Sequence, residues 1–167
     1  MEMLLTILNF VGYISTLIVV IGTIAGVIMW FKGILPALLR LGNGLAKRKI
    51  AVFAKTENLT SLKNLLIHSK LFNEKNIIEI TKKEDIGIAE GATVYLVYWN
   101  DWSENIDKIL QQRKDSEALI VYAPDGPGSI PKDKMRLLDG KRNTAVTNFR
   151  GRLLNDIVTA MITTSYN

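Results

Sequence analysis

The sequence contains no cysteine and only one histidine. The missing thiols exclude disulfides, thiolate catalysis and zinc or iron sites built on cysteine. A Ser-His-Asp triad would require His68, which lies in LTSLKNLLIHSKLF, a pattern typical of an ordinary amphipathic helix. We therefore expect neither a cysteine-based nor a histidine-based catalytic centre, and we expect no metal ion or organic cofactor.

Charge is absent from the start of the chain, where 29 residues separate Glu2 from Lys32. A helix of that length is about 43 Å long, whereas the hydrocarbon core of a bilayer is about 30 Å thick. The run therefore predicts one transmembrane helix within residues 1–32. A cleaved signal peptide is disfavoured because the apolar run is too long, no Lys or Arg precedes it and no small-residue cleavage site follows.

The charges that follow this run are mostly basic. Residues 1–50 have a net charge of +4 and the rest of the chain +1. By the positive-inside rule, this predicts a single-pass protein of the inner (cytoplasmic) membrane, with its N-terminus outside and its C-terminal domain in the cytoplasm. Residues 33–48, interrupted by Pro36 and Arg40, are too short to span; they suit an interfacial helix or neck, with a re-entrant segment as the alternative.

A seam of polar and small residues repeats along the expected span with a seven-residue period. The seam consists of Asn9, Gly12, Thr16, Val19, Thr23, Gly26 and Trp30. Isoleucines at the same spacing fall on the opposite face. Small and polar residues toward a partner, with bulky residues toward lipid, are typical of a membrane helix that self-associates. The seam predicts a homo-oligomer in the lipid bilayer. The alternatives are a water-lined pore built from several copies, and threonines that bond only to their own helix.

From residue 49 onward, short β-branched runs alternate with helical patterns. We expect strands at 49–54, 76–81, 92–99, 117–123 and 143–149, and helices at 59–72, 103–115, 132–140 and 150–166. These repeats predict an α/β fold with a five-stranded parallel sheet, flavodoxin-like or TIR-like, and helices on both faces. The expected strand order is 2-1-3-4-5. Residues 49–167 would form one cytoplasmic sensor domain.

In this order, ligands bind at the switch point where strands 1 and 3 end. The expected ligand-binding residues follow the strands: Lys55, Thr56, Asn58, Trp99, Asn100, Trp102, Asp125, Gly126, Gly128, Arg150 and Arg152. Cations and helix N–H groups suit an anionic group and tryptophans can stack a base, so the set predicts a nucleotide pocket. Alternatively, the tryptophans cover the sheet, GPGS is only a turn, and the arginines pair with Asp101 or Asp125.

Three enzyme classes of similar fold each require particular residues in these loops. A phosphoryl receiver requires an acidic cluster after strand 1 and a lysine after strand 5, where this chain has KTEN and TNFRG. A dinucleotide-binding oxidoreductase requires G-x-G-x-x-G, and KTENLTS has no glycine. A TIR-type NAD hydrolase would use a glutamate after strand 3, where Glu104 lies, although a carboxylate at a helix N-terminus is commonly only dipole-stabilised. We expect no enzyme, with a hydrolase using Glu104 as the alternative.

With its N-terminal span, basic neck and the loops YWNDWSEN, APDGPGSIP and NFRGRLLNDI, the chain resembles the membrane effectors of bacterial anti-phage systems. The organisation is similar to that of the transmembrane effectors of the Hailong system. The resemblance implies a tetrameric channel assembly controlled by a nucleotide or short single-stranded DNA from a partner enzyme. It also implies base stacking on Trp99 and Trp102, phosphate contacts from Lys55, Arg150 and Arg152, and a pore along the seam. A non-catalytic anchored scaffold is the remaining alternative.

Overall fold

The computed structural model describes residues 2–36, 42 and 47–164 of the 167-residue chain. The chain divides into two compact units, Met1–Gly42 and Asn43–Asn167, which we describe separately. The division lies inside the expected neck. Most of that neck, residues 37–41 and 43–46 with Arg40 among them, is outside the described residues, so the expected interfacial helix stays a prediction.

Within the first unit, residues 2–36 are helical. α1 (Glu2–Met29) continues into a π-helical turn, η1 (Trp30–Ile34), closed by a hydrogen bond from the Leu35 N–H to the Trp30 carbonyl. Within it, the stretch Asn9–Ile34 is long and apolar enough to cross a membrane, as the uncharged run predicted. Trp30 and Phe31 pack edge to face, with ring centroids 5.2 Å apart. These aromatic rings therefore lie directly before the first basic residue, Lys32.

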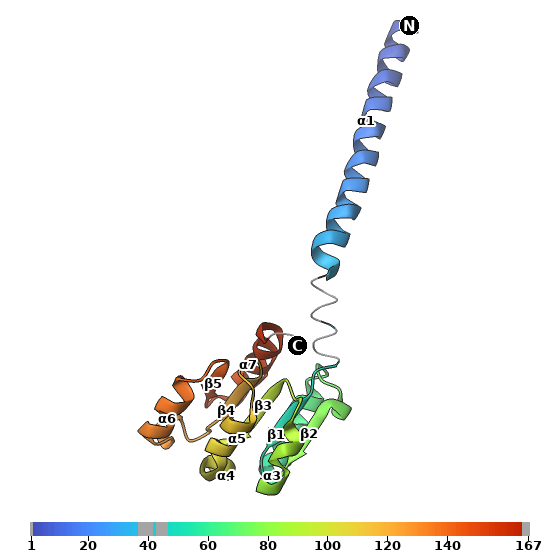
Figure 1. Ribbon diagram of the computed structural model, residues 1–167. Coiled ribbons are helices and arrows are strands. Elements are labelled where there is room, and N and C mark those ends of the chain that lie inside the picture. Colours follow the sequence, from blue (N-terminus) through green and yellow to red (C-terminus); the bar gives the residue numbers. More distant parts are fainter. Residues whose placement is uncertain (1, 37–41, 43–46, 165–167) are drawn as a thin grey trace. The chain divides into compact units, whose positions relative to one another are not determined.

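The second unit contains a five-stranded, all-parallel sheet in the order β2-β1-β3-β4-β5 (Figure 1). The strands are β1 (Ile50–Phe53), β2 (Ile77–Ile80), β3 (Val94–Tyr98), β4 (Ala118–Tyr122) and β5 (Thr144–Thr147). All residues of β1 and β4 are buried, because helices cover the central strands on both faces. The fold class and the strand order predicted from the sequence are confirmed.

One face of the sheet is covered by α3 (Thr56–His68) and α7 (Arg150–Thr163). Their buried leucines and isoleucines pack against Val52, Leu96 and Ile120 of the sheet. α3 begins three residues earlier than predicted, so the polar KTEN stretch enters the helix instead of forming a loop. This difference matters because two of the expected ligand-binding residues, Thr56 and Asn58, lie in the first turn of α3, and a third, Lys55, is its N-cap residue.

The other face carries short helices. They are η3 (Lys83–Ala89), α4 (Trp99–Trp102), η4 (Ser103–Asn105), α5 (Ile106–Gln112) and α6 (Lys132–Asp139), while η2 (Glu74–Asn76) and η5 (Pro127–Ser129) are single 3-10 turns. Ile86, Ile109 and Leu138 from these helices join Phe53 and Tyr95 in a second buried cluster. The two clusters show that alternate residues of each strand pack on opposite faces, as the pleat requires.

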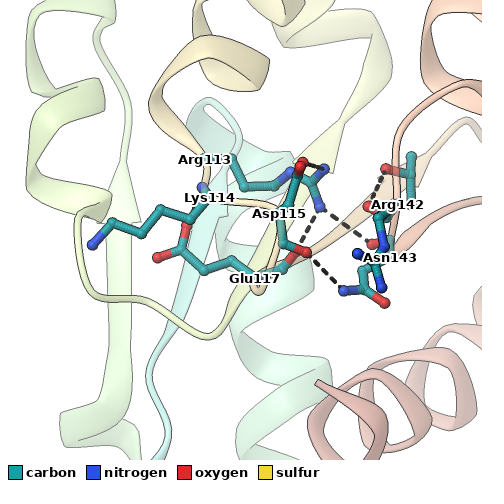
Figure 2. A network of polar contacts seen from close by, with 7 residues as sticks. Arg113, Lys114, Asp115, Glu117, Arg142 and Asn143 are labelled. Atoms are coloured by element: carbon teal, nitrogen blue, oxygen red, sulfur yellow. Dashed lines mark hydrogen bonds and ion pairs between the residues drawn. The ribbon is translucent and has the colours of Figure 1, made fainter. Parts of the chain in front are cut away.

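A polar network around the buried Arg113 joins the amino-terminal ends of β4 and β5 (Figure 2). Arg113 is 6% exposed; its Nη1 donates to the Glu117 carbonyl, and its Nη2 lies 4.0 Å from the Asp115 carboxylate. The Asn143 side-chain amide donates to the Asp115 carbonyl at 2.8 Å. Burial lowers the pKa of the Arg113 guanidinium, and burial together with the nearby Glu117 carboxylate raises the pKa of the Tyr95 hydroxyl. The network therefore fixes the start of β5 against β4.

We expect Arg113→Ala to destabilise the domain by about 1–3 kcal/mol, because it leaves the Glu117 and Asn143 main-chain carbonyls without the donor that Arg113 supplies. The measurement is thermal unfolding of the full chain in detergent, followed by circular dichroism. The matched control is Lys108→Ala on the exposed side of α5, for which a change within about 0.5 kcal/mol is expected. Equal melting temperatures for the two variants would contradict a structural role for the network.

Candidate functional site: the carboxyl edge of the sheet

The expected ligand-binding residues all lie at the carboxyl edge, by which we mean the segments that directly follow β1, β3, β4 and β5. Parallel strands end at the same edge of a sheet, so residues distant in the sequence meet there. The structure brings two of these residues, Asn100 and Asp125, into direct contact. The other hydrogen bonds and ion pairs of the set are made with residues outside it, and these pairings were not apparent from the sequence.

The Asp101 carboxylate joins the end of β3 to the start of α3. Its Oδ2 accepts a hydrogen bond from the Lys55 N–H at 2.7 Å, and both carboxylate oxygens lie 3.1 Å from the Asn58 amide nitrogen. A carboxylate at the N-terminus of a helix satisfies an unpaired N–H and interacts favourably with the helix dipole. Asp101 therefore occupies the place at α3 where the sequence had suggested an external anion.

Thr56, the first residue of α3, has a φ of +42°. This left-handed backbone conformation is uncommon for a β-branched residue and costs on the order of 1–3 kcal/mol. The neighbouring Lys55 is the N-cap residue but makes no capping bond with its own side chain. The abrupt turn from β1 into α3 is thus held by the contact of Asp101 with the backbone.

A second pairing lies between the segments after β3 and β4. The Asn100 side-chain amide donates to the Asp125 carboxylate at 2.7 Å. Gly126 adopts a φ of +92°, and its carbonyl accepts from both the Ser129 N–H and the Ser129 hydroxyl. Gly128 lies in η5 within the same turn. The interpretation of GPGS as a turn is therefore confirmed, and its role in binding stays a prediction.

The two arginines of the set differ in their surroundings. Arg150 begins α7 and reaches α3, where its guanidinium donates to the Ser61 hydroxyl at 2.7 Å and to the Ser61 carbonyl at 2.9 Å. Arg152 has a largely exposed side chain and pairs with Asp156 one turn further along α7, at 3.3 Å. Neither arginine pairs with Asp101 or Asp125, so that alternative was wrong. Arg150 instead links the two helices that cover this face.

The tryptophans are part of the core. Trp99 is 4% exposed and Trp102 is 1% exposed, and the Trp102 ring packs edge to face on Phe53 with centroids 5.3 Å apart. The sequence had suggested that these rings stack a base, but α4 turns them inward beneath the carboxyl edge. The alternative that they cover the sheet therefore describes the structure, and an exposed stacking surface on Trp99 and Trp102 is not present.

Three aromatic residues outside the expected set lie at this edge. Phe149, the N-cap residue of α7, is 66% exposed. Tyr98 and Tyr122 end adjacent strands and pack edge to face, 5.7 Å between centroids. Burial raises the pKa of the Tyr98 hydroxyl, with further contributions from Asp101, Tyr122 and Asp125, and Arg150 opposes them. The sequence feature that could have identified Phe149 is its position directly before Arg150, at the expected start of a helix.

Glu104, the residue of the alternative hydrolase, lies in η4 with an exposed side chain. No group of three or more metal-ligating side chains occurs within residues 2–36, 42 and 47–164. The use of Glu104 in a hydrolase stays a prediction.

The seam residues of α1 and η1 are all exposed on the single helix. The Thr16 hydroxyl donates to the Gly12 carbonyl at 2.9 Å, and the Thr23 hydroxyl donates to the Val19 carbonyl at 2.8 Å. Both bonds thus run along the seam, from one seam residue to another. Each hydroxyl oxygen keeps a lone pair that can still accept a bond from a partner or from water.

Comparisons with protein-family models, with curated proteins and with solved structures found no match for this chain.

The indole N–H of Trp102 is buried and makes no hydrogen bond in the structure. An unsatisfied buried donor costs about 1–3 kcal/mol, so we expect Trp102→Phe to leave the melting temperature unchanged or to raise it. By contrast, Trp102→Ala should destabilise by about 3–5 kcal/mol because it leaves a cavity beside Phe53. Thermal unfolding of the full chain would measure both. A loss of stability in Trp102→Phe as large as that in Trp102→Ala would contradict this expectation.

Proposed function

We propose that this chain is a single-pass membrane effector that self-associates through the α1 seam and responds to a small anionic signal of nucleotide type. In this proposal the signal binds at the carboxyl edge of the cytoplasmic α/β domain and changes how the seams pack. The observation that carries the proposal is the polarity of α1. One face consists of small and hydroxyl-bearing residues and the other of isoleucines, on a helix long enough to span a bilayer.

The seam supports close packing between copies of the helix. Gly12 and Gly26 carry no side chain and lie exposed on the helix, so another backbone can approach closely there. The hydroxyls of Thr16 and Thr23 are already donated within the helix, which leaves a compact surface without an unpaired donor at those positions. Several copies arranged with their seams inward would either pack dry or enclose a narrow polar pore.

The carboxyl edge supports a domain with two arrangements. Its donors are satisfied by the chain itself, through the contacts of Asp101 with Lys55 and Asn58 and of Arg150 with Ser61. An anionic ligand that takes the Arg150 donors now bonded to Ser61 competes with Ser61 and thereby weakens the link between α7 and α3. A ligand shifts the equilibrium between two conformations only by binding one of them more tightly than the other. The exchange of the Ser61 contact for a ligand contact provides such a difference in affinity.

The resemblance to Hailong effectors extends the proposal to anti-phage defence. In that setting the assembly is a channel or membrane-disrupting oligomer, the signal is a nucleotide or short single-stranded DNA, and a partner enzyme supplies it. The basic residues that follow the span favour a cytoplasmic domain and an outside N-terminus. The near-neutral domain favours a short ligand over long DNA, since long DNA requires many phosphate contacts.

We expect Thr16→Leu combined with Thr23→Leu to lower the number of subunits per particle and to abolish any membrane leakage. Each leucine adds bulk on the seam, where close approach is required. Native mass spectrometry in lipid nanodiscs measures the subunit number, and dye release from liposomes measures leakage. The control is Ile14→Leu combined with Ile21→Leu on the opposite face, which should change neither quantity. Loss of assembly in the control alone would contradict the assignment of the seam.

We expect Arg150→Gln to weaken nucleotide binding about tenfold, which corresponds to the loss of one charge-assisted hydrogen bond. Ser61→Ala is the matched control, because it frees the Arg150 guanidinium from its hydroxyl partner and should retain or strengthen binding. The probe is a fluorescein-labelled four-nucleotide oligothymidylate, read by anisotropy with the full chain in nanodiscs and ATP as competitor.

Two outcomes would contradict this assignment. The first is unchanged binding in Arg150→Gln. The second is consumption of NAD by the wild-type chain that Glu104→Gln abolishes, because that result supports the hydrolase.

A further inference from the structure

β5 is the outermost strand of the sheet on the side of α6 and α7 (Figure 1). The Leu119 N–H donates to the Asn143 carbonyl and the Ala123 N–H donates to the Thr147 carbonyl, so alternate residues of this segment bond to β4. In a parallel ladder the residues between them direct their N–H and C=O groups to the other side. The backbone groups of Thr144 and Val146 therefore face away from the sheet.

A hollow of about 220 Å³ lies beside this edge, between α7 and the β4–β5 pair. Its lining includes Asn143, Thr144, Ala145, Asp156, Thr159 and Thr163. It forms because α7 packs over the central strands through Leu153 and Ile157, while the small, exposed Ala145 leaves the outer part of the face uncovered. Side chains of a strand placed beyond β5 would alternate, and those on the α7 side would reach this hollow.

β5 lacks the features that usually block an edge strand. Natural edges are protected by charged residues, proline or bulges, whereas TAVT contains no charge and no proline. The opposite edge strand differs, because β2 carries Glu79 in its middle, where Lys63 holds the carboxylate at 3.0 Å. One edge of the sheet is therefore protected by an ion pair on the strand, and the other presents unblocked backbone groups.

Basic residues lie at both ends of β5. Lys141 and Arg142 precede it and are exposed (Arg142 is drawn in Figure 2). Arg150 and Arg152 follow it. Residues 139–152 therefore have a net charge of +3. Antiparallel pairing of β5 with a second copy of itself would bring these cations against one another, which is unfavourable. An extended segment with acidic residues at its ends would be electrostatically complementary.

We propose that β5 is a docking edge for an extended acidic peptide of another protein, which joins the sheet as a sixth strand. Its backbone pairs with Thr144 and Val146, alternate side chains enter the hollow beside Ala145, and one of its acidic ends meets Lys141 and Arg142. Strand addition takes its affinity from main-chain bonds and its specificity from alternate side-chain pockets. The main-chain contacts with Thr144 and Val146 do not involve Arg150 or Ser61, and the inference does not depend on nucleotide binding at those two residues.

The test uses the full chain in lipid nanodiscs and a fluorescein-labelled synthetic peptide, EEVTVTVEE, read by anisotropy. We expect the acidic peptide to bind at least about tenfold more tightly than KKVTVTVKK, with an affinity that falls as salt is added. N-methylation of the three central residues of the peptide should abolish binding, because methylation removes main-chain donors and blocks the approach of the strands. Equal binding of the methylated and unmethylated peptides would overturn strand addition.

Two protein variants complete the test. Val146→Pro removes the outward N–H without removing a bond to β4, and we expect it to weaken binding about tenfold or more. Val146→Ala is its control for lost packing and should bind within about twofold of wild type, and circular dichroism confirms that both fold. Lys141→Glu combined with Arg142→Glu should remove the preference for the acidic peptide.

Retained acidic preference in that double variant would overturn the assigned charge contacts. If Val146→Pro lowers the number of subunits per nanodisc, β5 is an interface between copies of this chain, and the proposed peptide partner is wrong. Equal binding of the peptide by Val146→Pro and Val146→Ala would likewise place the peptide elsewhere on the domain.

Discussion

The carboxylate of Asp101 ties the ends of β1 and β3 together, and the arrangement of the carboxyl edge depends on that contact. By accepting the Lys55 N–H it fixes the start of α3, and through the Asn58 amide it holds the first turn of the helix. The strained backbone of Thr56 is compatible with the fold because this contact over-determines it. The switch point of the sheet, where α/β proteins commonly bind ligands, is thus filled by a side chain of the chain itself.

Strand number, direction and order could be predicted from the sequence because they depend on alternation of apolar runs with helical patterns over many residues. β4 illustrates this, since EALIVYA contains a continuous apolar run and β4 is buried along its whole length. The uncharged run before Lys32 likewise predicted α1, because the length and apolarity of a segment are sufficient to identify a candidate membrane-spanning helix. Features that depend on the combined hydrophobicity of many residues could therefore be predicted from the sequence.

The contacts at the carboxyl edge could not be predicted, because they depend on the orientation of single side chains. WNDW reads equally well as an exposed loop or as a helical turn; in the structure it is α4, which turns Trp99 and Trp102 inward and Asp101 toward α3. The sequence showed that Arg150 would be near the edge. It did not show that Ser61, 89 residues earlier, would be its partner. Pairings of this kind follow from the three-dimensional arrangement of helices.

In the membrane oligomer that we propose, the hydroxyl bonds within α1 affect how reversibly the helices associate. Thr16 and Thr23 donate to carbonyls of their own helix, so a lone helix in lipid already has these donors paired. Association of two such helices requires no new hydrogen bond at these positions, and their separation breaks none. The free energy of helix association then comes mainly from shape complementarity and van der Waals contact, and it is modest. An interface of that kind can be rearranged by a weak force from outside the membrane, without a hydrogen-bonding penalty at these threonines.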